Sequence, residues 1–331
     1  MAHEEIVRES PRSSRPISRA ALLGIAVGLP VSVLFLWLAF RGADLSAVWD
    51  AALSANLWLV AGAVVLSGTL YILQGARWHV IAAVSRPDTR GFVEMVVGAV
   101  ACNNVLPGRI GEIFRARWLA VAAPMPSGRA FATVGLDRTC DVVTLFTFLV
   151  VALPFVAPAS WVIRIVVVTG ILLAVLGMLL VAGRGYARRR HRQRRARGRI
   201  RRVARDIVDT LAEPFEKRRF AVALGLSAAA WGAFAAAVWL VTRSIGVDLD
   251  PLDCVFVAAV LNLGVAIPSS PGFVGTYQWL SVASLAVFDV APEQALAFSF
   301  LIHACWYVPT TLVGGFLVLF RLDWGIRRHR T

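Results

Sequence analysis

Long apolar runs alternate with short polar segments through most of the chain. A bilayer core about 30 Å thick requires roughly 20 apolar residues in a helix. Six runs reach that length, at 20–40, 57–83, 129–155, 161–182, 220–242 and 293–320. The pattern predicts an all-α polytopic membrane protein with about six full spans. A shorter run within 41–56 has apolar residues at helical spacing and predicts a helix lying on the membrane surface.

Two further apolar stretches, 91–120 and 253–290, are interrupted. Pro107 and Gly108 break the first, and Arg109, Glu112 and Arg115 follow the break. A charge near the bilayer centre costs roughly 2.5 to 3.5 kcal/mol, and broken backbone survives there only inside protein or beside a wet cavity. We therefore expect each stretch to form a re-entrant hairpin of two half-helices, with its polar residues facing a cavity.

The two interrupted stretches resemble each other. Asn103 is followed by Pro107-Gly108-x-x-Gly111, and Asn262 is followed by Pro271-Gly272-x-x-Gly275. Pro is favoured at the first position of a helix, so each Pro is expected to begin a half-helix whose free N–H groups form an anion site. The glycines allow close approach of the backbone to a ligand or helix.

The distribution of charge predicts the topology. Residues 184–202 hold eleven arginines and no acidic residue. Cytoplasmic loops collect Lys and Arg, which places this loop inside, puts both termini in the cytoplasm, and lets the two hairpins enter from opposite sides. That is the inverted-repeat arrangement of many transporters. The expected organisation is a disordered tail at 1–19, a first membrane repeat at 20–156, a second at 157–320 with a basic loop at 184–219, and a cytoplasmic tail at 321–331.

The net charge of +14 would suit nucleic acid, but the excess lies in the one basic loop. That loop has no interleaved aromatic platform, so binding to anionic headgroups is the preferred interpretation, with a protein partner left open. Four single cysteines and five histidines form no metal-binding pattern, and no nucleophile or Walker motif is present. We expect no metal, no cofactor, no specific nucleic acid and no enzymatic activity. The oligomeric state is not indicated.

Several charged and polar residues allow two interpretations. Asp137 and Asp141 share a helix face with Arg138 beside them, either pairing to hold helices together or exchanging partners during function. Arg109 and Arg115 suit a phosphate, and Glu112 suits an amine, a proton or a neighbouring arginine. Asn103 and Asn262 either bind substrate or satisfy freed backbone groups. Arg77 is interpreted as an interface anchor, and His303 with Tyr307 as packing.

Three stretches together resemble the lysylphosphatidylglycerol synthase transmembrane (flippase-like) family: 103–119, LDRTCD at 136–141 and PSSPGFVGTYQ at 268–278. The resemblance spans roughly 20–320 and implies a protein that moves a lipid or lipid-linked headgroup between leaflets. Matched by position, the family's residues are Asn104, Pro107, Arg109, Gly111, Glu112, Arg115, Asp137, Arg138, Asp141, Pro268, Ser270, Pro271, Gly272 and Gly275. The expected substrate-binding set takes these positions except Pro268 and adds Asn103, Gly108 and Asn262.

Two departures limit what the resemblance implies. The third stretch commonly continues Gly-Gly and then Glu, where this chain has Gly272-Phe273 and then Thr276 to Gln278. The soluble aminoacyl-transferase domain of the full-length synthase is absent, so lysyl transfer is not expected. The leading hypothesis is a flippase for an anionic lipid or lipid-linked headgroup in the inner or plasma membrane. A membrane enzyme acting on a polyprenyl-phosphate or phospholipid, and a non-transporting scaffold, remain alternatives.

Overall fold

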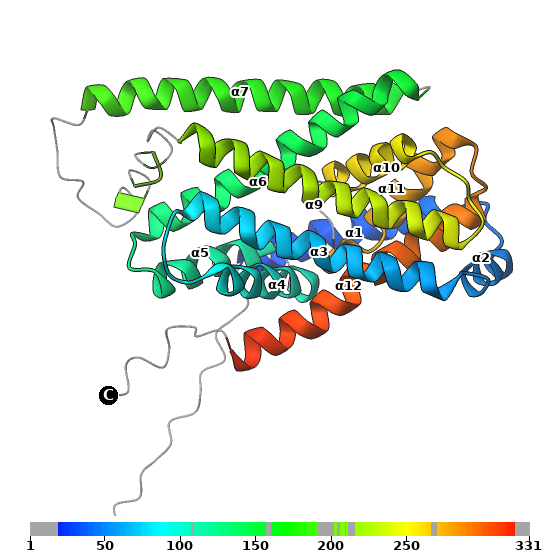
Figure 1. Cartoon of the computed structure of the whole chain (residues 1–331). Coiled ribbons are helices and arrows are strands. Elements are labelled where there is room, and N and C mark those ends of the chain that lie inside the picture. The colour runs from blue at the N-terminus through cyan, green and yellow to red at the C-terminus, as the bar shows by residue number, and fades with distance from the viewer. Residues whose placement is uncertain are drawn as a thin grey trace, which may run out of the picture.

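The structure is a computed structural model that describes residues 19–106, 109–156, 160–190, 202–203, 206–208, 210, 216–265 and 270–321. Every regular element in these ranges is helical, which confirms the predicted all-α class (Figure 1). The helices are α1 (Arg19–Phe40), α2 (Leu45–Leu53), α3 (Leu57–Ala82), α4 (Thr89–Val105), α5 (Gly111–Ala122), α6 (Ser127–Ala152), α7 (Ser160–Arg190), α9 (Lys217–Ser244), α10 (Pro251–Gly264), α11 (Thr276–Leu285) and α12 (Pro292–Phe320). Short 3-10 turns occur at η2 (Leu153–Phe155), η3 (Pro271–Phe273) and η4 (Ala286–Phe288).

A long helix occupies each of the six ranges predicted to span the membrane. Among the described residues, four helices are long and apolar enough to cross: α3, α6 extended through η2, α9 and α12. A fifth span is counted if α1 from Leu29 and α2 are taken as one bent pair, with an angle of 85° between them. In α7 the apolar portion that qualifies as a shorter helix is Ser160–Val175. Length and composition therefore support four to five spans within this part of the chain.

Helix α2 turns away from α1 because local capping starts it in a new direction. Gly42 adopts a φ of +83°, and the Asp44 side chain accepts a hydrogen bond from the Ser46 N–H at 2.8 Å. An Asp at this N-cap position satisfies an N–H group that the helix itself leaves free. Leu45, Trp49 and Leu53 then lie exposed, one helical turn apart. An exposed apolar stripe of this kind is typical of a helix at a membrane surface.

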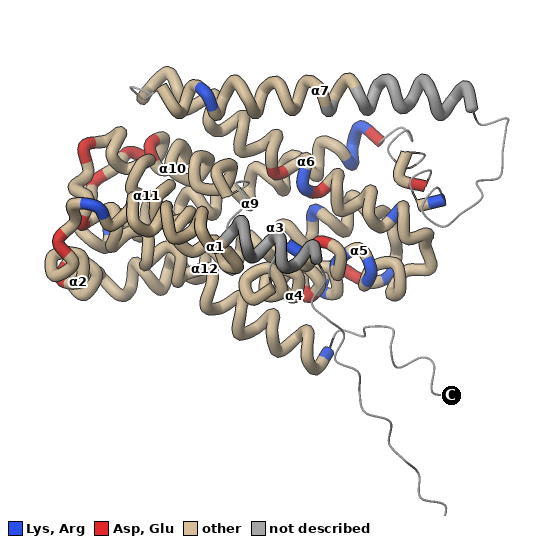
Figure 2. Tube along the Cα trace, turned by 180° about the vertical axis from the view of Figure 1, so that it is seen from behind, with Lys and Arg blue, Asp and Glu red and all other residues tan. Residues whose placement is uncertain are grey.

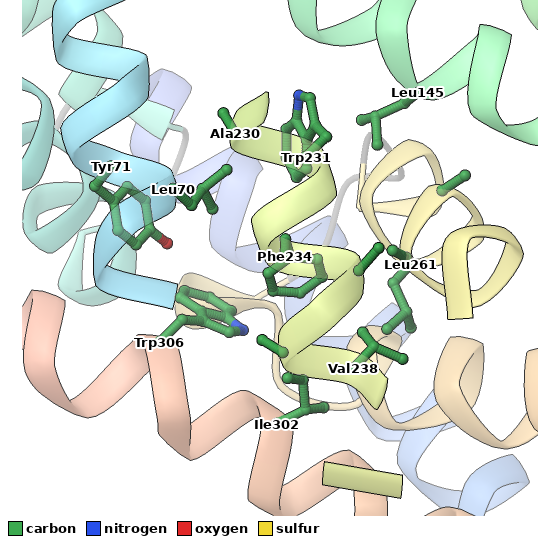
Figure 3. Packing of buried hydrophobic residues seen from close by; sticks show 14 of the residues in the cluster. Leu70, Tyr71, Leu145, Ala230, Trp231, Phe234, Val238, Leu261, Ile302 and Trp306 are labelled. Atoms are coloured by element: carbon green, nitrogen blue, oxygen red, sulfur yellow. The ribbon is translucent and has the colours of Figure 1, made fainter. Parts of the chain in front are cut away.

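Helix α9 lies at the centre of the bundle and packs against α3, α6, α10 and α12. Figure 3 shows Phe234 and Val238 of α9 between Leu70 of α3, Leu261 of α10 and Trp306 of α12. Helix α7 runs along the outside of the bundle and contacts it chiefly through α6 (Figure 1). The core therefore fixes α3, α6, α9 and α10, the helices that carry or border the charged residues.

The two interrupted stretches are not continuous rods. Helix α4 packs against α5, and α10 packs against α11, so the chain folds back on itself at each break. Their re-entry into a membrane stays a prediction. Pro107, Gly108 and Pro268 lie outside the described residues, and so do the roles predicted for them.

The half-helices begin later than the sequence predicted. Helix α5 starts at Gly111 rather than Pro107, and Pro271 begins only the turn η3, with α11 starting at Thr276. The reason is backbone conformation, because Arg109 and Phe273 adopt left-handed φ angles of 53° and 60°. Such residues cannot continue a right-handed helix, so the free N–H groups lie beyond them.

Candidate functional site

The two breaks meet each other. The Arg109 guanidinium donates a hydrogen bond to the carbonyl oxygen of Val265, which caps the C-terminus of α10. It also lies 5.2 Å from the centroid of the Phe273 ring. We call Arg109, Val265 and Phe273 the junction. Arg109 and Phe273 occupy the same place in the Pro-Gly-x-x-Gly repeat, and each left-handed conformation costs about 1–2 kcal/mol. Such outliers persist where surrounding contacts hold them.

Each break is closed by an amide side chain. The Gly111 N–H donates to Asn103 Oδ1 at 2.8 Å, and the Gly275 N–H donates to Gln278 Oε1 at 2.7 Å. Asn103 therefore satisfies a freed backbone N–H group, and its predicted contact with a substrate stays a prediction. Asn262 instead bonds to the Ala258 carbonyl inside α10, so it does not close its break. Gln278 takes that role, and its position three residues after Gly275 was the signal that sequence reasoning missed.

The glycines of the repeat are sites of close backbone approach, as predicted. A Cβ on Gly111 would lie 2.1 Å from the Ala99 carbonyl oxygen, and one on Gly275 would lie 2.2 Å from the Ser32 carbonyl oxygen. The Ser270 N–H donates to Ser32 Oγ at 2.9 Å, so α1 also holds the second break. At Gly272 a Cβ would lie 2.6 Å from the Tyr307 ring.

A buried ion network joins four helices beside the first break. Asp137 of α6 accepts from Arg77 Nε of α3 at 2.8 Å and from Arg115 Nη2 of α5 at 2.6 Å, and all three side chains are almost fully buried. Asp141 accepts from Arg77 Nη1 at 2.6 Å and from Trp231 Nε1 of α9 at 2.9 Å. Figure 2 shows basic residues in blue and acidic residues in red along the traces of α3, α5 and α6. Arg138 Nη2 also lies 3.3 Å from Asp137 Oδ2, so the expected pairing within the 136–141 motif is present, while an exchange of partners during function stays a prediction.

The outer edge of the network is partly open. The side chains of Arg138 and Glu112 are 41% and 30% exposed, and their closest charged atoms are 3.9 Å apart. Arg138 also lies 3.3 Å from Asp141 Oδ2, and Glu112 lies 3.4 Å from Arg115. Three arginines (Arg77, Arg115 and Arg138) and three carboxylates (Glu112, Asp137 and Asp141) give a net charge of 3 − 3 = 0. Arg109 is not one of these six residues, so its positive charge is additional to the neutral network.

Two arginines differ from their sequence interpretation. Arg77 is fully buried and bonded to Asp137, Asp141 and Ser227, so the prediction of an interface anchor is wrong. The missed signal is a second polar residue, Gln74, one turn earlier in an apolar run. Arg115, predicted to hold a phosphate, lies over the Trp78 ring at 4.2 Å and is enclosed by its carboxylate partners. In this conformation it orients the network rather than facing a ligand.

The second break is held from inside by His303. Gln278 Nε2 donates to His303 Nδ1 at 3.0 Å, while the His303 ring stacks on Trp306 at 4.9 Å. Because Gln278 uses its oxygen for Gly275, its amide nitrogen faces the histidine, which assigns the ring proton to Nε2. Nearby, Asn104, which was expected to bind substrate, donates to Thr311 Oγ1 of α12 at 2.8 Å. His303 thus packs as predicted and also fixes the break.

One known family and one curated protein match the chain. The profile of the family described as "Lysylphosphatidylglycerol synthase TM region" matches residues 22–314. A Haloferax volcanii protein named "Glycosyltransferase AglD" is 28% identical over 350 residues, covering 92% of this chain and 54% of the relative. The chain thus spans about half the length of this curated relative.

The relative's name overturns one expectation. We predicted no enzymatic activity, and this prediction is wrong. The relative that matches 92% of the chain has the name of an enzyme. That prediction relied on missing nucleophile and phosphate-loop motifs, which identify only the enzymes that use such motifs. The expectation is therefore withdrawn.

Proposed function

The chain belongs to the lysylphosphatidylglycerol synthase transmembrane family, and from this premise we propose that it binds an anionic lipid or lipid-linked headgroup at the junction and moves it between leaflets. The single observation that carries the proposal is the contact of Arg109 with the second broken segment. A headgroup bound there would touch both breaks at once. The acyl or prenyl tails can stay in lipid, so only the headgroup needs a polar path.

The partners of Arg109 support an anionic ligand. A backbone carbonyl and an aromatic ring satisfy the guanidinium only weakly, whereas a phosphate accepts two parallel charge-assisted hydrogen bonds. No carboxylate among the described residues forms an ion pair with Arg109, and the residue is exposed, so a ligand can reach it. Because the neighbouring network is already neutral, an anion at the junction would balance the remaining positive charge.

The inner and outer ion pairs of the network suit different roles during lipid movement. The buried pairs around Asp137 are 2.6 to 2.8 Å long and hold the helices together, while the pair of Arg138 with Glu112 is longer and partly exposed. We assign the exchange of partners to this outer pair. Residues 20–156 and 157–320 would be the two inverted halves, with both termini cytoplasmic in the cell membrane.

Lipid accessibility in reconstituted vesicles tests the proposal. Headgroup-labelled anionic and zwitterionic lipids are followed with a quencher that cannot cross the membrane. Hydrogen bonds to charged groups contribute about 1.5–3 kcal/mol, so we expect Arg109→Gln to slow movement of the anionic lipid roughly tenfold or more. Arg243→Gln is the matched control, because Arg243 is an exposed arginine on α9 that pairs with Asp248 in the loop after this helix. Equal rates for wild type and Arg109→Gln would remove the proposed role.

The relative is named a glycosyltransferase, which favours an enzyme as a second candidate. We propose a polyprenyl phosphate held at the same junction as the substrate of such an enzyme. A phosphate bound by Arg109 would serve either role. The same vesicles distinguish the two when they contain polyprenyl phosphate and a nucleoside-diphosphate sugar is added outside. Formation of a polyprenyl-phosphate-linked sugar, with release of the nucleoside diphosphate, supports the enzyme, while movement of polyprenyl phosphate between leaflets without a new product supports the flippase.

A further inference from the structure

A cavity of about 580 Å³ opens between the C-terminal end of α3 and the N-terminal end of α9. None of its lining residues belongs to the junction or to the ion network. Its lining combines apolar side chains, including Val80 and Val222, with the polar side chains of Ser85, Arg218 and Arg219. The cavity therefore offers both an apolar wall and a cationic wall.

The cavity lies where two apolar helices end. Apolar residues of α3 continue to Ala82, past the buried Arg77, and the apolar part of α9 begins at Phe220. For helices that cross a bilayer, the ends of the apolar runs mark the level of the lipid headgroups. The lining residues 83–85, Glu216, Arg218 and Arg219 lie on the polar side of this boundary, while Val80 and Val222 lie on the apolar side.

The charges around the cavity are not balanced. Arg219 Nε pairs with Glu216 Oε2 at 3.1 Å, but Arg218 forms no ion pair within the described part of the chain. The lining thus carries two arginines and one glutamate, for a net charge of 2 − 1 = +1. Cations in the first turn of a helix also meet the positive end of its dipole, which raises the local positive potential further.

One wall of the cavity is held rigid. Both ring nitrogens of His79 are engaged, with Thr89 Oγ1 at 2.8 Å and with the Val84 carbonyl at 2.9 Å. These bonds tie the loop after α3 to the start of α4. The cavity is therefore bordered by a fixed loop on the α3 side and by the cationic first turn of α9 on the other.

We propose that this cavity binds an anionic phospholipid of the surrounding membrane, separately from the substrate at the junction. Its phosphate lies against Arg218 and Arg219, and the start of an acyl chain lies against Val80 and Val222. A cavity that crosses the headgroup level with cations above and apolar side chains below matches the chemistry of such a lipid. Inorganic phosphate shares the anionic group and lacks the chain.

Native mass spectrometry of the full chain tests this by counting lipid adducts with phosphatidylglycerol and with phosphatidylcholine. We expect the wild type to retain phosphatidylglycerol preferentially, and the Arg218→Gln/Arg219→Gln double variant to lose at least tenfold in adduct occupancy. Arg243→Gln, on the same helix at the opposite end, should bind like the wild type. Val222→Trp keeps every charge but fills the cavity, and it should lose binding as the double variant does. Val222 is 44% exposed, so the larger side chain is compatible with folding.

Three results would overturn the proposal. The first is wild-type binding by Val222→Trp, which would reduce the effect to diffuse charge attraction. The second is displacement of the lipid by inorganic phosphate at equal concentration, which would make free phosphate the ligand. The third is unchanged binding by the double variant. Lipid movement measured on Val222→Trp in vesicles should stay at the wild-type rate, which separates this site from the junction.

Discussion

Asp137 binds two arginines from two other helices with its two carboxylate oxygens, out of reach of solvent. Replacing it with Asn would leave three buried or half-buried arginines facing two carboxylates. Breaking a buried pair in this way typically costs about 3–5 kcal/mol. We therefore expect Asp137→Asn to lower the free energy of unfolding in detergent micelles by that amount, measured by denaturant titration.

The matched control for that substitution is Asp248→Asn. Asp248 pairs with Arg243 at 2.9 Å, but its side chain is 78% exposed. Exposed pairs contribute only about 0–1 kcal/mol because water and salt screen them. If the two asparagine variants lost equal stability, the network around Asp137 would not be the electrostatic centre that its burial implies.

Single residues could be predicted from the sequence only where their partners are near in the chain. Asp137, Arg138 and Asp141 lie on one turn of one helix, so their grouping follows from helical spacing. Arg77 joins them from 60 and 64 residues away, and nothing in its local sequence gives that distance. The position of Arg115 of α5 over the Trp78 ring of α3 depends on how both helices pack against α6 and was equally hidden.

At the scale of elements, both breaks have the same construction. Two residues after a left-handed residue stands a glycine, Gly111 or Gly275, whose N–H donates to an amide side chain. The Pro-Gly-x-x-Gly spacing predicted the breaks and their likeness. It did not predict where the half-helices begin, because positive φ is uncommon for residues such as Arg and Phe and follows from tertiary contacts.

A substitution at Gly111 tests whether the break depends on close packing. Gly111→Ala would drive a Cβ into the Ala99 carbonyl, and overpacking of this kind costs about 1–3 kcal/mol. Gly135→Ala on α6 meets nothing within 4 Å, so it should instead stabilise the helix by about 0.5–1 kcal/mol. Opposite shifts of the thermal unfolding midpoint are expected, and shifts of the same sign would contradict the packing at Gly111.

At the scale of the whole molecule, two sets of contacts organise the bundle around α9. The ion network fixes α3, α5, α6 and α9 to one another, and the junction brings the first broken segment against the second. The helical class and the family follow from apolar run lengths and three short motifs. The inverted topology rests on the charge of 184–202, most of which lies outside the described residues, so it stays a prediction.

The most direct test of this account is whether the two breaks touch in the membrane-embedded protein. Arg109→Cys and Phe273→Cys are combined in a chain whose four native cysteines are replaced by alanine, and a short bifunctional thiol reagent is added in vesicles. The account predicts an intramolecular crosslink in high yield, and none for Arg109→Cys with Asp248→Cys, which lies in the loop after α9. Absence of the first crosslink, or equal yield from both pairs, would contradict a site formed by the meeting of the two broken segments.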